Sequence, residues 1–144
     1  MEKQPQFPFA PKDFARCLNA TCPRSQNCLR RTAALQDTDE HLFLKVVNPL
    51  RYPKEGEECE LFRSTDKVRM AWGVTHLLDN VPYKEGSLLR NMIINHLGRS
   101  QYYRCFRKER PFAPQDQQTI RMLFRRRGIS EEPSFDYYTN EFNW

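Results

Sequence analysis

Three of the five cysteines in this 144-residue chain lie within twelve positions, in the stretch CLNATCPRSQNC from residue 17 to residue 28. Their spacing is C-x4-C-x5-C, and Cys59 follows after 30 further residues. Four thiolates complete the tetrahedral shell of a structural zinc ion, and such a site can join segments that are distant in sequence. The spacing therefore predicts a four-cysteine metal knuckle formed by Cys17, Cys22, Cys28 and Cys59.

Several alternatives to zinc stay open for this cluster. A four-cysteine iron–sulfur cluster accepts irregular spacing, whereas the familiar zinc signature uses two C-x2-C hooks. Inert buried thiols are disfavoured because Pro and Asn, rather than apolar residues, lie between the cysteines. Cys105 is expected to be a core thiol, or to replace Cys59 as the fourth ligand. We expect zinc, with an iron–sulfur cluster as the alternative, to stabilise a proline-rich half that has little core of its own.

A disulfide framework or a redox role is the least favoured interpretation of the cysteines. Five is an odd number, which suits metal or free thiols better than a closed set of disulfides. The amino-terminal stretch MEKQPQFPFAPKDFA lacks the apolar core of a secretory signal, and no apolar run approaches the roughly 18 residues that cross a bilayer. The sequence therefore predicts a cytoplasmic protein in a reducing compartment, without a membrane partner.

Apolar spacing and capping residues predict a mainly α protein with a short strand and loop region, in a small single domain. The expected parts are an extended arm over 1–12, a cysteine-rich metal-binding part over 13–63 and a helical part over 64–144. A strand is expected over 41–47, where HLFLKVV is apolar and β-branched. Helices are expected over 23–36, 64–80, 87–97, 100–110, 113–127 and 134–142.

Positive charge gathers in one part of the sequence. Residues 87–128 hold ten Lys and Arg against two acids, a net of +8, whereas the whole chain carries +5. Clustering of this kind is typical of a surface that binds a polyanion. The acidic tail after Gly128 is expected to fold back on this segment and weaken its field.

The segment NHLGRSQYYRCFRKERP has the pattern of a recognition helix. Spacing places Tyr102, Cys105, Phe106 and Glu109 on one side, for docking. Guanidinium and amide groups contact phosphates and base edges. The predicted contact residues are Arg99, Gln101, Arg104, Arg107 and Lys108. Residues 88–128 resemble the second half of a repressor-type helix-turn-helix, and this resemblance implies binding to DNA or RNA.

Two other interpretations of the basic segment stay open. It can be a solvated face, since Arg125, Arg126 and Arg127 complement the negative end of a helix dipole. It can also dock an acidic protein partner, with Tyr137, Tyr138 and Trp144 as anchors of a protein-interaction adaptor. The sequence predicts no enzyme, because its three histidines join no catalytic set and its five glycines are scattered singly.

Taken whole, the chain resembles a family of short, uncharacterised proteins from Bacteroides-type bacteria. The resemblance rests on CLNATCPRSQNCLRR, the VNP turn at 47–49, Cys59, and YYRCFRKERP followed by IRMLFRRRG and FDYY. It spans nearly the full length and implies one compact, cytoplasmic, bacterial-type protein. It implies no particular activity.

Overall fold

The computed structural model describes residues 9–37 and 40–144, so most of the predicted extended arm lies outside the described residues. The chain forms two compact units. Unit 1 comprises Met1–Asp66 together with Phe142–Trp144, and unit 2 comprises Lys67–Glu141. Because unit 1 contains both an early and a late part of the sequence, unit 2 is inserted within it.

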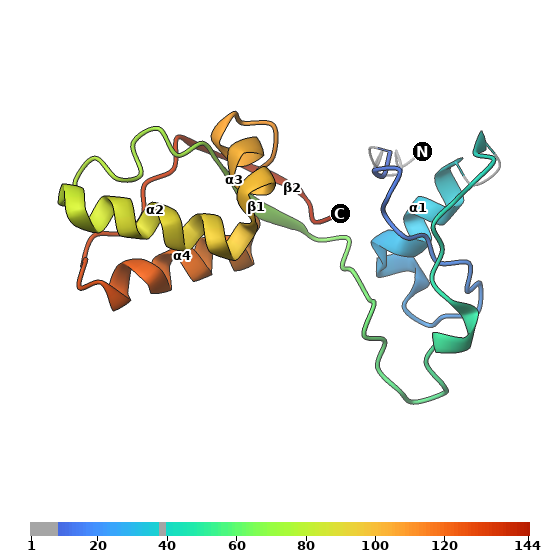
Figure 1. Ribbon diagram of the computed structural model, residues 1–144. Coiled ribbons are helices and arrows are strands. Elements are labelled where there is room, and N and C mark those ends of the chain that lie inside the picture. Colours follow the sequence, from blue (N-terminus) through green and yellow to red (C-terminus); the bar gives the residue numbers. More distant parts are fainter. Residues whose placement is uncertain (1–8, 38–39) are drawn as a thin grey trace, which may run out of the picture. The chain divides into compact units, whose positions relative to one another are not determined.

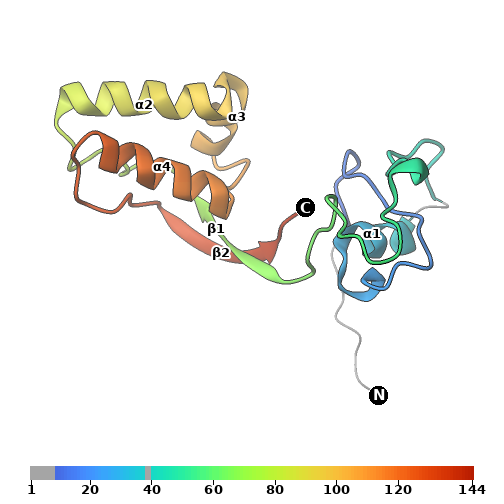
Figure 2. The same ribbon diagram turned by 90° about the horizontal axis from the view of Figure 1, so that it is seen from below.

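Unit 2 consists of three helices and a two-stranded sheet (Figure 1). Its helices are α2 (Tyr83–Leu97), α3 (Arg99–Phe106) and α4 (Pro114–Arg126), and its strands are β1 (Lys67–Trp72) and β2 (Tyr137–Phe142). Figures 1 and 2 show α2 and α4 side by side, with α3 at the carboxyl end of α2. The sheet pairs β1 with β2, which are separated in sequence by all three helices.

The ends of the unit 2 helices follow from local chemistry. Gly98 adopts φ 86°, a left-handed conformation that ends α2 and lets α3 begin at the next residue. Pro114 occupies the first turn of α4, where its missing N–H costs no hydrogen bond. Gly128, with φ 74°, follows the end of α4. These helices were predicted over 87–97, 100–110 and 113–127, so their existence is confirmed, although α2 begins four residues earlier.

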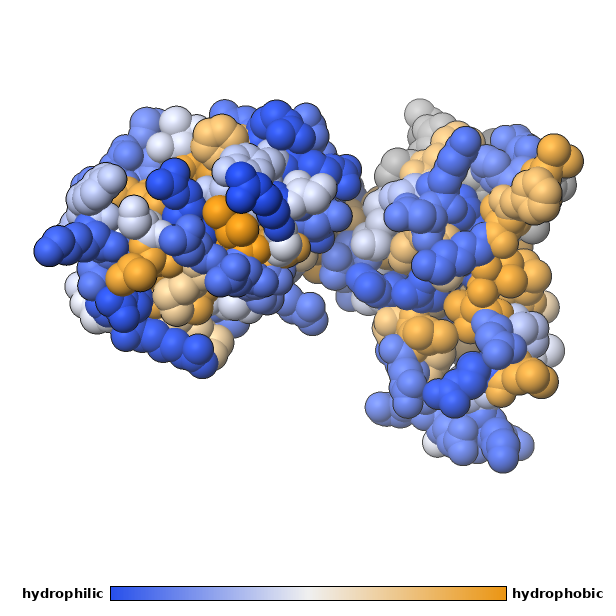
Figure 3. Space-filling model, viewed as in Figure 1, coloured by the Kyte–Doolittle hydropathy of each residue, from blue (hydrophilic) through white to orange (hydrophobic). Residues whose placement is uncertain are grey.

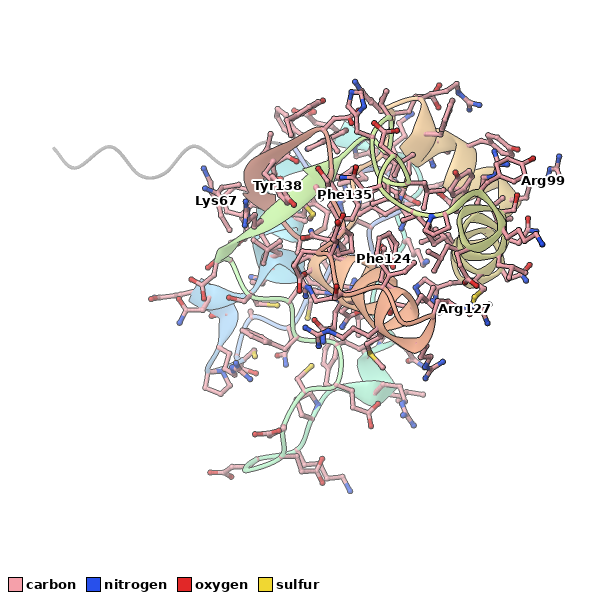
Figure 4. The ribbon with its side chains drawn as sticks, turned by 90° about the vertical axis from the view of Figure 1, so that its left-hand side faces the viewer. Lys67, Arg99, Phe124, Arg127, Phe135 and Tyr138 are labelled. Carbon is pink, nitrogen blue, oxygen red and sulfur yellow. The ribbon has the colours of Figure 1, made fainter. Side chains whose placement is uncertain are left out.

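A continuous apolar cluster forms the core of unit 2. Figure 4 shows Phe124 and Phe135 in the middle of this unit, with Arg99 and Arg127 on its rim. The buried cluster consists of Ala71, Val74, Leu77, Leu89, Ile93, Tyr102, Cys105, Phe112, Ile120, Leu123, Phe124 and Phe135. Every helix and β1 contribute to it, so the helices of unit 2 are fixed by shared packing.

Two predicted helices are strands, because pairing over a long sequence distance overrides local spacing. The expected helix over 64–80 is replaced by β1, and the expected helix over 134–142 is replaced by β2. The Trp72 ring stacks on Tyr137 with centroids 5.9 Å apart, and its Nε1 donates to Oγ1 of Thr139 at 2.7 Å. Gly73 then turns the chain with φ 78°.

Unit 1 is built mainly from loops around α1 (Leu29–Asp37), with short 3-10 turns η1 (Ser25–Asn27) and η3 (Pro49–Arg51). Cys28 was expected inside a helix, but it is extended, directly before α1. The expected strand over 41–47 is wrong as well, since Val46 makes only an isolated bridge to Arg16. Arg16 is fully buried, and its Nη1 donates to the carbonyl of Phe14 at 2.9 Å.

The core of unit 1 is small. It consists of Ala10, Phe14, Leu29 and Ala33, with Phe142 and Trp144 packed against it. Figure 3 shows hydrophobic residues on the surface of this unit, and the most exposed are Leu42, Phe43 and Leu50, at 96, 93 and 91%. Unit 1 therefore leaves much of its apolar surface outside its core.

The predicted four-cysteine knuckle is wrong. Among the described residues no group of three or more His, Cys, Asp or Glu side chains is arranged to hold a metal ion. All five cysteines are free thiols. Over its described part the chain is a small fold with four α-helices and a two-stranded sheet, and none of those helices is long and apolar enough to cross a membrane.

Candidate nucleic-acid interface

Helix α3 is anchored in the core along one side. Tyr102 and Cys105 are buried, as predicted for the docking side. Burial raises the pKa of the Cys105 thiol to about 11 and also raises the pKa of Tyr102. Phe106 was expected on the docking side but is 53% exposed. The helix ends at this residue, so its ring lies at the margin of the packed surface rather than within it.

The outer side of α3 alternates cations with aromatic rings. We call it the α3 face, and it consists of Arg99, Tyr103, Arg104, Phe106 and Arg107, all of which are exposed. The Arg99 guanidinium carbon lies 5.6 Å from the centroid of the Tyr103 ring, within cation–π range. The Tyr103 and Phe106 rings meet edge to face, with centroids 6.3 Å apart. Sequence reasoning assigned neither ring to a binding surface, although their three-residue spacing beside arginines was visible.

Two of the five predicted contact residues are engaged within the protein. Gln101 accepts a hydrogen bond from Nη1 of Arg110 at 2.8 Å. Lys108 directs its Nζ to Oδ2 of Asp136 at 3.2 Å. These contacts withdraw the Gln101 amide oxygen and the Lys108 ammonium group from the set that is free to meet a ligand.

The other three contact residues keep their guanidinium groups at the surface. Arg107 pairs with Glu109 in two hydrogen bonds, of 2.8 and 3.2 Å, which lower the pKa of Glu109 and raise that of Arg107. The Arg99 guanidinium lies over the Tyr103 ring, and neither Arg99 nor Arg104 makes a side-chain hydrogen bond or ion pair within the described part of the chain. Arg99 and Arg104 therefore keep their guanidinium groups outside ion pairs, although the charge of Arg104 helps to lower the pKa of Glu109.

The Lys108–Asp136 pair depends on an unusual backbone. Lys108 has φ 61°, a left-handed conformation that is rare outside glycine. Gly73 lies beside the pair, and a Cβ atom there would collide with the Asp136 carboxylate and with Cε of Lys108. Burial acts to raise the pKa of Asp136, but hydrogen bonds from Thr75, at 2.7 Å, and from Lys108 outweigh it, so the pKa is lowered. Gly73, Thr75 and Asp136 therefore together allow the Lys108 ammonium group to bind within the protein.

The acidic tail folds back on the basic segment, as expected from sequence. Besides the Asp136 contact, Oε2 of Glu132 accepts a hydrogen bond from Nε of Arg121 at 2.7 Å, and Oε1 of Glu132 lies 3.5 Å from Nη2 of Arg125. Both arginines lower the pKa of Glu132. The described contacts of the tail therefore neutralise part of α4 and do not include Arg99 or Arg104.

The basic segment does not form one surface. Arg127 at the end of α4 donates two hydrogen bonds, of 2.7 and 2.9 Å, to Glu85 at the start of α2. At the other end of α2, His96 lies 3.3 Å from Asp116 at the start of α4. The two helices are therefore antiparallel, and the α4 arginines lie roughly 22 Å, the length of the 15-residue α2, from the α3 end.

The helix-turn-helix resemblance loses a required part. The preceding helices of such a motif would have to come from 64–80 and 87–97, and over 64–80 the structure has β1 and a glycine turn instead. The α2–α3 connection is a single residue, Gly98. The α3 face is therefore described by its own residues and not by that motif.

The four cysteines assigned to the knuckle line one pocket in unit 1. Among the residues around it are Cys17, Cys22, Cys28, Cys59, Arg24, Arg30, Arg31 and Arg51. Arg30 is fixed by hydrogen bonds from Nε to the carbonyl of Leu61 at 2.7 Å and from Nη1 to that of Ala15 at 3.0 Å.

Arg30 holds a positive charge beside the thiols of the cysteine pocket. Burial lowers the pKa of Arg30, with a further contribution from Arg63, whereas nearby Cys28 acts in the opposite direction. A guanidinium favours the thiolate form of a neighbouring cysteine, so its charge does not by itself oppose a metal ion. The arrangement of the side chains decides the point: within the described residues no three of them are placed to hold the zinc or iron–sulfur group expected from their spacing.

A family model described as a family of unknown function, DUF6078, matches residues 1–144, and the chain belongs to this family. Neither a curated protein nor a solved structure gives a significant match. The function must therefore be argued from the residues of the chain itself.

Proposed function

We propose that this member of the DUF6078 family binds nucleic acid, DNA or RNA, through the α3 face. One observation carries the proposal: Arg99 and Arg104 are exposed, and in the described part of the chain neither is in an ion pair, on a helix whose opposite side is buried. Guanidinium groups bind phosphate oxygens through charged hydrogen bonds. A helix anchored in a packed core holds such groups in place better than a loop does.

The charge of unit 2 supports the proposal. Residues 67–141 hold 13 Lys and Arg against eight Asp and Glu, a net of +5, which is the net charge of the whole chain. The remaining residues hold ten of each sign and are neutral overall. The field that attracts a polyanion therefore originates in the unit that carries α3.

The proposal uses a smaller contact set than the sequence indicated. Arg99 and Arg104 meet phosphates, and Arg107 assists with a charge that Glu109 partly offsets. Gln101 and Lys108 are left out because their polar groups are engaged by Arg110 and Asp136. No metal takes part in this proposal.

A salt titration with a matched control tests the proposal. Binding of labelled DNA and RNA oligonucleotides, measured by fluorescence anisotropy between roughly 50 and 200 mM salt, should weaken linearly on a double logarithmic plot. Arg99→Gln with Arg104→Gln should reduce the slope by about 0.7 to 0.9 for each phosphate contact removed. Arg125→Gln with Arg126→Gln makes the same change in net charge at the far end of α4 and should leave the slope nearly unchanged.

Two results would overturn this assignment. Equal loss in both double variants would mean that net charge, and not the α3 face, governs binding. Absence of binding by the intact protein at the lowest salt concentration would remove nucleic acid as the ligand.

An acidic protein partner is the alternative for the same face. Two of its three expected aromatic anchors pack against rings of the same chain: Trp144 meets Phe14 with centroids 5.3 Å apart, and Tyr137 stacks on Trp72, while Tyr137 and Tyr138 remain 45 and 38% exposed. This engagement favours nucleic acid over an adaptor. Recovery of one protein partner after nuclease treatment, combined with no binding to oligonucleotides, would reverse the preference.

A further inference from the structure

The two exposed rings of the α3 face are not explained by phosphate binding. Tyr103 and Phe106 are 37 and 53% exposed, and they lie three residues apart on the same helix. A phosphate contact needs a cation or a hydrogen-bond donor, which Phe106 lacks entirely. A surface that combines open rings with arginines therefore calls for a ligand with both flat apolar faces and negative charge.

The rings are held in place before any ligand arrives. Tyr102, which is buried, meets Tyr103 edge to face with centroids 5.3 Å apart. It also lies beside Phe106, with centroids 6.5 Å apart and planes inclined by 29°. The three rings support one another through an anchored member, so less freedom is lost when a flat group packs on them.

Arginines flank these rings on the same helix. Arg99 precedes Tyr103 by four residues, one helical turn, and its guanidinium lies over that ring. Arg104 follows Tyr103 directly and is in no ion pair within the residues that the structure describes. Rings and cations at this spacing match a strand in which bases and phosphates alternate.

The bases of a duplex hide their faces within the stack, whereas a single strand can turn them outward. Stacking on aromatic side chains tolerates any base, because every base has a π face. Resting on the proposed function, we infer that the α3 face binds single-stranded nucleic acid, with bases stacked on Tyr103 and Phe106 and phosphates held by Arg99 and Arg104. The ligand class is thus an unpaired strand rather than a duplex.

Oligonucleotides of one sequence, offered as single strands and as duplexes in both DNA and RNA form, test this inference. The intact protein should bind the single strands more tightly. Tyr103→Leu with Phe106→Leu should weaken single-strand binding by roughly tenfold for each ring, while duplex affinity and the salt slope stay unchanged. Leucine keeps an apolar helix-forming side chain at both positions, so the fold is retained.

Two controls separate stacking from other effects. Tyr83→Leu removes a tyrosine that is 88% exposed at the start of α2, away from α3, and should leave both affinities unchanged. Arg99→Gln with Arg104→Gln should weaken single strands and duplexes alike and should reduce the salt slope. Far-UV circular dichroism confirms that each variant is folded.

Each outcome decides between the two proposals. Equal affinity for single strands and duplexes, or equal loss of both in the leucine variant, would overturn the stacking inference and leave phosphate binding by α3 intact. No binding to any oligonucleotide would overturn the proposed function, and the inference with it. A preference for the RNA or the DNA strand supports the inference, provided that the single strand is preferred to its duplex.

Discussion

Unit 1 and unit 2 reach an ordered structure by different means. Twelve buried residues form one cluster in unit 2, whereas the described residues of unit 1 form a cluster of four, with Cys28, Ala34 and Val47 buried apart from it. In unit 1 the buried Arg16 and the half-buried Arg30 donate to backbone carbonyls, and these bonds take the place of apolar packing between loops. Apolar burial is the dominant favourable term in folding, so unit 2 supplies the firmer base for a binding surface. The α3 face lies on that base.

The largest expected effect comes from removing a ring from the core of unit 2. Phe124→Ala should lower the free energy of unfolding by about 3 to 5 kcal/mol, because it leaves a cavity among the helices. Leu50→Ala, at an exposed apolar position of unit 1, should change it by less than about 0.5 kcal/mol. Urea denaturation followed by circular dichroism measures both. Similar losses would mean that Leu50 is covered in solution and that the contrast between the units is smaller than described.

A glycine substitution in each unit sharpens the comparison further. Gly73→Ala should cost about 2 to 3 kcal/mol, because a positive φ is unfavourable for alanine and the new Cβ meets the Lys108–Asp136 pair. Gly56→Ala in unit 1 has a similar φ of 83° but open space around it, so it should cost only about 1 kcal/mol. The same unfolding measurement compares them. Equal costs would show that the collision in unit 2 is relieved freely and that Lys108 is not held inward.

Alkaline pH should weaken unit 2 by a smaller amount. The pKa of Cys105 is raised to about 11 by burial, so the neutral thiol is favoured in the folded state. Its stabilisation is complete below pH 9, the ordinary thiol value, and is lost as the pH rises through 11, by up to about 3 kcal/mol. The raised pKa of Tyr102 adds a contribution of the same sign.

Unfolding free energies measured across this pH range test the expectation. Cys105→Ala lowers stability at every pH through lost packing, but it should flatten the alkaline slope, and Tyr102→Phe should flatten it further. An unchanged slope in the double variant would place the alkaline sensitivity outside α3.

Local patterns predicted the helices of unit 2 well and its strands badly. Gly98 and Pro114 act through their own backbone, so capping rules place α2, α3 and α4 close to their observed bounds. The strands are decided by contacts such as Trp72 with Thr139, 67 positions apart, which no local window contains. The spacing of Val68, Ala71 and Val74 also fits a helix, so it does not distinguish a helix from a strand. Pairing with β2 makes 67–72 a strand.

The candidate site was predictable only as far as residue types determine it. The sequence places Tyr102 and Cys105 on the buried side of α3, and both are buried. The sequence does not show which arginines form ion pairs, because a partner can be distant: Arg127 is paired with Glu85, 42 positions away. The cysteine spacing predicted a metal knuckle, but spacing carries no information on whether distant thiols converge on one point, and among the described residues no three are placed to hold a metal ion.

The packing of Trp144 on Phe14 affects the order in which the units can be completed during synthesis. Phe142–Trp144 belong to unit 1, yet the ribosome makes them only after the whole of unit 2. Domains usually fold in the order in which they emerge, amino-terminal part first. Here the amino-terminal unit must wait with part of its core unfilled, while the inserted unit already has all its residues. Unit 1 is therefore the first unit to be synthesised and the last to complete its core.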